Sequence, residues 1–359
     1  MLDFLKEKTD CWDVLRRAEE PIFIYGMGDG AEKILKVFDM YRIPTAGFFA
    51  SDEFVRGHSF KGHLVHSLSQ IEKLVPDFIV VLAFGAGYES LYRRIEDIAA
   101  RHTLYAPDVP VVGDGLFTYA YAVENAAKIR KVYDLLADDL SRKTFADVLN
   151  FRISGKIEYL TDCKCDEQEL YSLLSLGDNE IYADLGAYNG DTVMSFIDTV
   201  GGRYEHIYAV EPDRVSFRKL CRTAEKNILA DKITCINACA WDTEGEVEFS
   251  QAHGRNSSAQ TTNARLMQKN NTVQTISVDS LPQIPTYIKA DVEGAEMKVT
   301  GGMKKAVENG CKLNIALYHR TEDIFEIPLA IHRMDPSYKL YIRHKMYIPA
   351  WETQLIAVK

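Results

Sequence analysis

The sequence has no long apolar run, no secretion-signal core and no excess of positive charge. Because a membrane span needs about 18 consecutive apolar residues, we expect no membrane-spanning segment. The N-terminal stretch MLDFLKEKTDCWDVLRR predicts a charged amphipathic helix rather than a signal peptide. The net charge is −10 and the pI about 5.5, so we expect no nucleic-acid partner.

Cysteine is scarce and unpatterned. The seven cysteines are an odd number scattered along the chain, and without a secretion signal they predict reduced thiols in the cytoplasm. Cys163 and Cys165 form a C-x-C pair that has too few neighbouring ligands to indicate a zinc site.

The composition is that of a globular protein large enough for two hydrophobic cores, with 47% hydrophobic and 26% charged residues among 359. We predict a Rossmann-like α/β domain over 1–115, a helical connector or cap over 116–176, and a second α/β domain over 177–359.

The stretch Glu180–Ile197, EIYADLGAYNGDTVMSFI, indicates a buried strand, a glycine turn and an amphipathic helix. Gly186 and Gly190 give the turn conformational freedom and allow a ligand to approach closely. Asp191 or Thr192 is expected to cap the helix. The predicted apolar positions are Ile181, Ala183 and Leu185 in the strand and Val193, Phe196, Ile197 and Val200 in the helix.

Asp184, at the end of this strand, indicates the kind of ligand. The turn lacks the G-x-G-x-x-G pattern of dinucleotide-binding folds. A carboxylate beside the turn would repel a phosphate, which is the usual ligand of such a helix N-terminus. It suits S-adenosylmethionine, which carries an ammonium and a sulfonium group.

Residues 21–112 also alternate between strand and helix patterns, which predicts a parallel sheet. The segments IYGMGDGAEKIL and GFFASDE resemble the N-terminal Rossmann-like domain of bacterial sugar-modifying enzymes. That resemblance implies a nucleotide-sugar or cofactor pocket at Gly26, Gly28 and Gly30, with Asp52 on a ribose. The alternative is a scaffold or oligomerisation domain without a ligand.

The connector shows apolar residues three and four positions apart, through Ile129, Val132, Leu135, Leu136 and Leu140. We expect it to pack between the domains or to cap the second pocket. Ser141, Arg142 and Lys143 are interpreted as solvated surface. Tyr159 and Tyr171 could line a sugar pocket, although half-buried packing is the commoner role of such tyrosines.

Two further strands come after the glycine turn. HIYAVEPD ends at Glu211, about 25 residues after Gly186, where a carboxylate can bind ribose hydroxyls. KITCINACAWD, Lys232–Asp242, is predicted as the third strand, with its end lying against an adenine. The polar loop HGRNSSAQTTNAR is predicted to be a lid or substrate loop.

The stretch PTYIKADVEGAEMKVTGG places Lys289, Asp291 and Glu293 at alternating positions after a buried strand. Ionisable groups in such a place are costly unless they are paired or used. The next strand, KLNIALYH, is expected to bring His319 to the same sheet edge.

From about Leu176 the chain resembles the FkbM family of methyltransferases, through DLGAYNGDT, VEPD, VDSL, IKADVEGAE, LYH and YIRHK in order. The resemblance implies a class I methyltransferase fold with seven strands, the last pair antiparallel. It also implies S-adenosylmethionine as cofactor and O-methylation of sugar or polyketide hydroxyls. By position it implies a cofactor site of Asp184, Gly186, Ala187, Tyr188, Gly190, Thr192, Glu211, Pro212, Asn237, Ala238 and Asp291.

For proton removal we expect His319 as general base, because its unperturbed pKa near 6.5 suits neutral pH. Asp291 is the second candidate, and Lys289 is expected to neutralise carboxylates. Asp291, Glu293 and His319 could instead hold Mg²⁺ or Mn²⁺. His344 is a further pocket candidate.

The sequence therefore predicts a methyltransferase of a sugar or glycan precursor, which could form a homo-oligomer. Two alternatives stay open: an NAD- or nucleotide-sugar-dependent enzyme using the N-terminal domain, and a non-catalytic sugar-nucleotide sensor. The N-terminal domain shows no tyrosine–lysine catalytic pair of an NAD-dependent epimerase or oxidoreductase.

Overall fold

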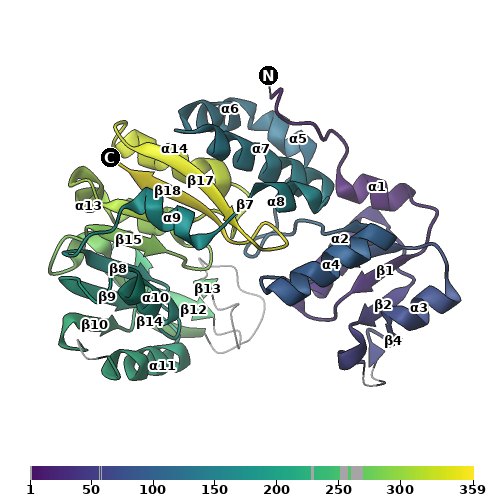
Figure 1. The fold of residues 1–359 in the computed structure, drawn as a ribbon, viewed down its shortest axis with the longest axis horizontal. Coiled ribbons are helices and arrows are strands. Elements are labelled where there is room, and N and C mark those ends of the chain that lie inside the picture. The colour runs from purple at the N-terminus through teal and green to yellow at the C-terminus, as the bar shows by residue number, and fades with distance from the viewer. Residues whose placement is uncertain (1, 56, 58, 228–229, 251–257, 260–269) are drawn as a thin grey trace.

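A computed structural model describes residues 2–55, 57, 59–227, 230–250, 258–259 and 270–359. Two α/β layers lie on opposite sides of the molecule, and the connector helices lie above and between them (Figure 1). Among the described residues, no helix is long and apolar enough to cross a membrane. All seven cysteines are free thiols.

The N-terminal sheet has the strand order β3-β4-β2-β1-β5-β6 and is parallel except at β3, so the predicted strand–helix alternation is confirmed. Its elements are β1 (Ile22–Tyr25), α2 (Asp29–Tyr41), β2 (Gly47–Ala50), the 3₁₀ helix η1 (Asp52–Phe54), β3 (Ser59–Phe60), β4 (His63–Ser67), α3 (Leu68–Leu74), β5 (Ile79–Leu82), α4 (Glu89–Arg101) and β6 (Thr103–Tyr105).

The first helix is shorter than predicted. Helix α1 spans only Cys11–Arg17. The backbone N–H groups of Lys6 and Glu7 donate hydrogen bonds to Asn150 Oδ1 at 2.7 and 3.0 Å. The preceding residues therefore lie against the connector instead of forming helical turns.

The connector consists of α5 (Tyr119–Glu124), α6 (Ala126–Leu135), α7 (Asp139–Ser154), α8 (Glu158–Cys163) and α9 (Glu167–Leu174). The prediction of a solvated surface at Ser141 is wrong, because this residue is fully buried. Its hydroxyl accepts hydrogen bonds from Arg343 Nη1 at 2.7 Å and from the Ile342 N–H at 3.1 Å. Helix α7 is thereby joined to the second sheet.

The second sheet has the order β10-β9-β8-β15-β16-β18-β17-β7. Strand β18 is antiparallel to both neighbours, so the expected antiparallel last pair is confirmed, and β7 adds a short eighth strand. The elements are β7 (Lys164–Cys165), β8 (Ile181–Leu185), α10 (Asp191–Thr199), β9 (His206–Val210), α11 (Arg214–Glu225), β10 (Ile233–Ile236), β15 (Tyr287–Ala290), α12 (Glu296–Gly301), α13 (Lys304–Glu308), β16 (Lys312–Ala316), α14 (Asp323–Met334), β17 (Lys339–Lys345) and β18 (Thr353–Val358).

The predicted single strand over Lys232–Asp242 is wrong, because the chain leaves the main sheet after β10. Asn237 Nδ2 donates to the carbonyl oxygens of Glu211 and Pro212 at 2.8 and 3.0 Å, which fixes the departure. A separate sheet of order β11-β14-β12-β13 comes next. It contains β11 (Cys239–Trp241), β12 (Gly245–Ser250), β13 (Ser258–Ala259) and β14 (Asn270–Ser277), and the 3₁₀ helices η2 (Ala230–Lys232) and η3 (Val278–Ser280) flank this region.

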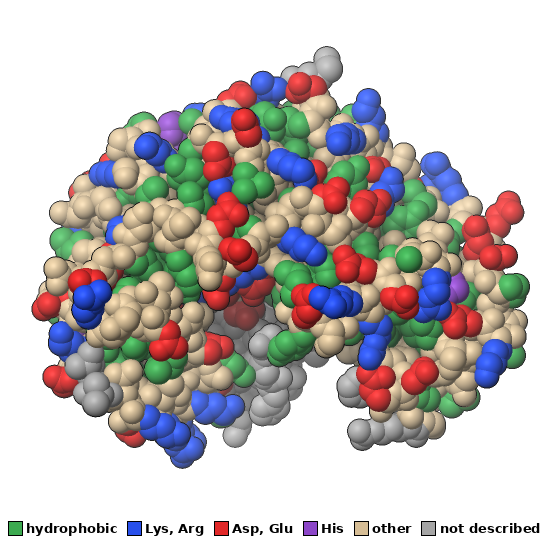
Figure 2. Space-filling model, in the orientation of Figure 1, with side chains coloured by type: hydrophobic (Ala, Val, Ile, Leu, Met, Phe, Trp, Pro, Cys, Tyr) green, Lys and Arg blue, Asp and Glu red, His purple; other side chains and the backbone are tan. Residues whose placement is uncertain are grey.

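The predicted lid, residues 253–265, lies outside the described residues except for 258–259. The space-filling view shows a notch between the two halves of the molecule, with acidic side chains at its inner end (Figure 2).

Candidate functional site

The two positions in the turn after β8 require glycine for different structural reasons. Gly186 has φ 83°, and a Cβ there would lie 1.9 Å from the Asp291 carbonyl oxygen. Gly190 has φ 88° and is itself the N-cap of α10, so the prediction that Asp191 or Thr192 caps this helix is wrong. The turn is thus fixed by its approach to the end of β15.

Asp184 lies behind this turn and is completely buried. Its carboxylate accepts a hydrogen bond from Thr192 Oγ1, and Oδ1 lies 3.6 Å from Lys289 Nζ. Oδ1 accepts no hydrogen bond from the described residues. Burial raises the pKa of Asp184, and the Lys289 ammonium and the Thr192 hydroxyl oppose that rise.

Lys289 joins two carboxylates, because its Nζ also lies 3.8 Å from Asp291 Oδ2. Burial alone would lower the pKa of Lys289, but Asp184 and Asp291 together raise it. The geometry therefore agrees with the neutralising role expected for this lysine.

Glu211 comes directly after β9 and is held by two backbone groups. Its Oε2 accepts from the Tyr188 N–H and its Oε1 from the Asp213 N–H, both at 2.8 Å. Burial raises the pKa of Glu211 to about 7. The two backbone hydrogen bonds hold the carboxyl in place, and Glu211 lines the cavity.

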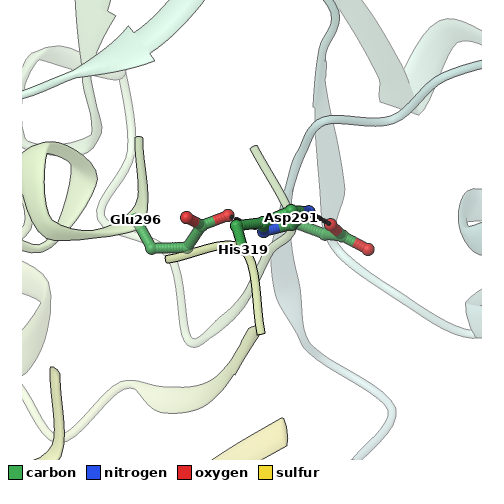
Figure 3. Close-up of side chains that lie close together, drawn as sticks. All are labelled: Asp291, Glu296 and His319. Atoms are coloured by element: carbon green, nitrogen blue, oxygen red, sulfur yellow. Dashed lines mark ion pairs between the residues drawn. The ribbon is translucent and has the colours of Figure 1, made fainter. Parts of the chain in front are cut away.

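His319 comes shortly after β16 and is surrounded by carboxylates (Figure 3). Its Nδ1 lies 2.8 Å from Glu296 Oε1. On the other ring edge, Nε2 lies 3.5 Å from Asp291 Oδ1 and 3.6 Å from Glu293 Oε2. Glu296 also accepts from the Val292 N–H at 2.9 Å. The predicted meeting of His319 with Asp291 and Glu293 is confirmed.

These surroundings change the protonation of the cluster. Burial alone would lower the pKa of His319, but Glu296, Asp291 and Glu293 raise it to about 10. The imidazole is therefore protonated at neutral pH, and the unperturbed value near 6.5 does not describe it. Burial raises the pKa of Glu293 to about 7.

Asp291 stays ionised. Burial alone would raise its pKa, but Lys289, His319 and Tyr318 hold it below its usual value. The Tyr318 hydroxyl donates to both carboxylate oxygens of Asp291, at 3.1 and 3.2 Å.

The same group offers possible metal ligands. One ligand atom each from Asp291, Glu296 and His319 lie within 4.8 Å of one another. However, Glu296 and Asp291 contact opposite edges of the imidazole (Figure 3). Because a metal ion binds only one nitrogen of the ring, this arrangement favours ion pairing over an ion shared by these three residues, and the predicted set of Asp291, Glu293 and His319 stays a prediction.

Sequence reasoning missed Glu296 and Tyr318. Glu296 lies in the first turn of α12, three positions after Glu293, and the sequence alone did not reveal that it faces the histidine. Tyr318 immediately precedes His319, and its ring centroid lies 4.2 Å from the imidazole centroid.

A cavity of about 350 Å³ opens at the carboxyl ends of β8, β9, β15 and β16. Of the predicted site residues, those that line it are Gly186, Tyr188, Thr192, Glu211, Pro212, Lys289, Asp291, Glu293 and His319. Asp184, Ala187, Gly190, Asn237 and Ala238 do not line it.

His344 does not line the cavity either and is fully buried. Its Nε2 is 2.9 Å from the Tyr347 carbonyl oxygen, and its Nδ1 is 3.0 Å from Thr353 Oγ1. Burial lowers the pKa of His344 to about 4. This histidine joins the two ends of the β17–β18 connection.

The strand order and the cavity at the carboxyl ends define a class I methyltransferase fold. Residues 184–344 match the model of the "Methyltransferase FkbM domain" and so form a domain of that family of methyltransferases. The expected FkbM methyltransferase domain and its fold class are thus confirmed, and the resemblance of the N-terminal part to sugar-modifying enzymes stays a prediction.

The whole chain is similar to a solved FkbM methyltransferase from Methylobacillus flagellatus KT. The identity is 22%, the TM-score is 0.74, and the match covers 99% of this chain and 95% of that one.

More distant similarities are to a precorrin-6y C5,15-methyltransferase from Geobacter metallireducens GS-15 (12% identity, 54% and 86% coverage, TM-score 0.35) and to Aeropyrum pernix fibrillarin with bound S-adenosyl-L-methionine (18%, 53% and 74%, 0.32). None of the curated proteins matches the sequence.

Proposed function

We propose that the chain is an S-adenosylmethionine-dependent O-methyltransferase whose acceptor is a hydroxyl of a sugar or glycan precursor. The observation that carries the proposal is the surplus of carboxylates in the cavity of the methyltransferase domain. The lining acidic residues are Asp191, Glu211, Asp213, Asp291, Glu293 and Glu352, and the lining cations are Lys289, Lys345 and the protonated His319. This surplus complements the ammonium and sulfonium charges of the cofactor.

The residues present fit that cofactor. Glu211 offers carboxylate lone pairs to a ribose, and its two backbone hydrogen bonds hold it in place. The turn from Gly186 to Gly190 would enclose the methionine part. Asp184 acts from behind by holding Thr192 and Lys289, both of which line the cavity.

When bound, the cofactor would supply an electrophilic methyl group on a positively charged sulfur. The chain must then align the hydroxyl, exclude water and remove the proton. We assign Asp291 as the base that removes this proton, because it lines the cavity and is ionised. His319 is protonated, so its part is to hold Asp291 and Glu293 in place. The Asp291 carboxylate would take the proton that the hydroxyl loses when the methyl group passes from the sulfur of the cofactor to the oxygen, which leaves the sulfur uncharged.

The test is a thermal-unfolding scan of the full chain with S-adenosylhomocysteine, NADH or a nucleotide sugar. A ligand at 100 times its Kd contributes about 2.7 kcal/mol, which corresponds to roughly 2–4 °C for a chain of this size. We expect a shift with S-adenosylhomocysteine that Glu211→Ala removes.

A matched control is Glu308→Ala, which removes an exposed carboxylate at the end of α13. A shift with NADH or a nucleotide sugar alone would overturn the cofactor assignment and move the ligand site to the N-terminal sheet. Methylation of nitrogen only, across an acceptor panel, would overturn O-methylation.

A further inference from the structure

The connection between β17 and β18 forms a wall of the cavity that the predicted site residues do not include. Tyr347, Trp351 and Glu352 of this connection line the cavity together with Gln354, the second residue of β18. The Tyr347 and Trp351 ring centroids lie 5.9 Å apart, with an angle of 34° between the rings. Aromatic rings of this kind give a hydrophobic surface with polar edges.

Two buried polar atoms on this wall have no hydrogen-bond partner among the described residues. They are the Trp351 indole nitrogen, a donor, and Gln354 Oε1, an acceptor. The Gln354 side chain is 95% buried, since its exposure is 5%. Because a buried polar atom without a partner is costly, a ligand that turned these side chains toward the cavity and supplied both an acceptor and a donor would relieve that cost.

Glu352 lies between these two residues in a strained conformation. Its φ is 67°, and two other cavity-lining residues, Tyr188 and Glu293, also have positive φ. Non-glycine residues in this region are costly and cluster at functional sites. Glu352 accepts from Gln354 Nε2 at 3.4 Å, which leaves further acceptor capacity toward the cavity.

The N-terminal sheet holds this wall in place. Ala86, after β5, exchanges two backbone hydrogen bonds with Ile348, at 2.7 and 3.1 Å. A Cβ on Gly85 would lie 2.3 Å from Tyr347 Oη, and one on Gly87 would lie 2.6 Å from the Tyr347 ring. The glycines of this turn therefore leave space for an aromatic residue of the cavity wall. In Figure 1 the yellow β17–β18 turn extends toward the N-terminal elements.

The charges near this wall do not suit a phosphate. Lys345 Nζ lies 3.3 Å from Glu167 Oε1 and 3.8 Å from Glu352 Oε2, and Lys289 is paired with Asp184 and Asp291. Among the described residues that line the cavity there is no arginine. An anionic group would thus meet carboxylates and lysines that are already neutralised.

We infer that the β17–β18 wall is the acceptor subsite and that it takes an uncharged polyhydroxylated ring, with the N-terminal sheet acting as its clamp. Hydroxyls, which donate and accept, match the Trp351 N–H, the Gln354 oxygen and the Glu352 carboxylate. The ring faces match the aromatic surface. This inference rests on the proposed function, since it identifies the second substrate of the same cavity.

The experiment is saturation-transfer NMR on the full chain saturated with S-adenosylhomocysteine. The probe is an equimolar mixture of the methyl glycosides of glucose, galactose, mannose, fucose and rhamnose, with glucose 1-phosphate and UDP-glucose in separate samples. We expect signals from at least one neutral glycoside and none from the phosphates. Trp351→Phe keeps an aromatic ring but removes the indole N–H, and Gln354→Met keeps the side-chain length but removes the amide group, so each should weaken binding about tenfold.

Gly87→Ala should also weaken the glycoside signal, although it lies outside the methyltransferase domain. Gly177→Ala is its control, because a Cβ there meets only Glu180 Oε1, at an ordinary 3.7 Å. S-adenosylhomocysteine affinity should stay unchanged in all four variants, which separates this inference from the proposed function.

Three outcomes would overturn the inference while the cofactor still binds. They are the absence of any neutral-glycoside signal in the wild type, stronger binding of the phosphates, and unchanged binding in Trp351→Phe and Gln354→Met. If the wild-type protein did not bind S-adenosylhomocysteine at all, the proposed function itself would be overturned.

Discussion

The two glycine turns of this chain, one in each sheet, are built alike and carry different chemistry. A Cβ on Gly30 would lie 2.2 Å from the Ala83 carbonyl oxygen, and one on Gly186 would lie 1.9 Å from the Asp291 carbonyl oxygen. Gly30 lies in the first turn of α2 and Gly186 in the turn after β8, and each glycine lets the backbone pass the end of the adjacent parallel strand, β5 or β15.

The two turns differ in the residues at the end of that adjacent strand. After β15 come Asp291 and Glu293, which enter a cavity. After β5 come Phe84, Gly85 and Ala86, and this turn contacts the β17–β18 connection. A glycine turn therefore reports the strand–turn–helix topology, whereas the side chains at the neighbouring strand end decide the chemistry.

The largest expected effect is on activity, and it distinguishes the residues at the end of β15 from those at the end of β5. Asp291→Asn removes the proposed proton acceptor, so methyl transfer should fall by about 10²–10⁴-fold while S-adenosylhomocysteine affinity changes little. The measurement is transfer of labelled methyl to an acceptor found in the glycoside screen. Asp77→Asn, an exposed carboxylate just before β5, is the control. Activity of Asp291→Asn equal to that of the control would refute the assignment.

The second effect is on stability against pH. The pKa of His319, raised from 6.5 to about 10 by Glu296, Asp291 and Glu293, gives up to about 5 kcal/mol. Because the folded pKa is the higher one, this contribution is complete below pH 6.5 and is lost as the pH rises through 10. The pKa of Glu293 is raised to about 7, so this residue adds a further loss of stability as the pH rises from 4.5 to 7.

Denaturant titrations at several pH values between 6 and 10 measure how steeply the free energy of unfolding falls as the pH rises. His319→Asn should flatten this slope. His344→Asn should leave it in place, because the pKa of His344 is lowered and its contribution changes only toward acid pH. Equal slopes in the wild type and His319→Asn would count against the ionised cluster.

A third effect concerns the buried carboxylate behind the turn. Asp184→Ala leaves Lys289 with one partner fewer and frees Thr192, so the free energy of unfolding should fall by roughly 3–5 kcal/mol. The thermal shift with S-adenosylhomocysteine should vanish with it. Asp198→Ala, on the exposed side of α10, is the control. Retained cofactor binding in Asp184→Ala would show that the turn needs no support from this residue.

The smallest effect compares the two glycines directly. Gly30→Ala and Gly186→Ala each create a contact with backbone, which costs roughly 1–3 kcal/mol, and Gly186→Ala adds the cost of its positive φ. Chemical denaturation should give a lower free energy of unfolding for Gly186→Ala than for Gly30→Ala. Only Gly186→Ala should weaken S-adenosylhomocysteine binding, and equal weakening by both would contradict the comparison.

Much of the fold could be predicted from the sequence because local patterns coincide with burial. Val193, Phe196 and Ile197, spaced for one helical face, are all buried in α10. Apolar alternation placed β8, and strand-end logic brought Asp291 and His319 together. The predicted strand over Lys232–Asp242 failed because Asn237 turns the chain out of the sheet through hydrogen bonds to a segment about 25 residues away.

The sequence by itself determined the methyltransferase family, the parallel sheets and the carboxylates at the strand ends, because these depend on short-range periodicity and on motifs read in order. Only the tertiary structure decided the protonation of His319, since its pKa depends on Glu296 from α12. It also decided that Gly85 and Gly87 serve the cavity wall, because the rings that need their space lie more than 250 residues later in the chain.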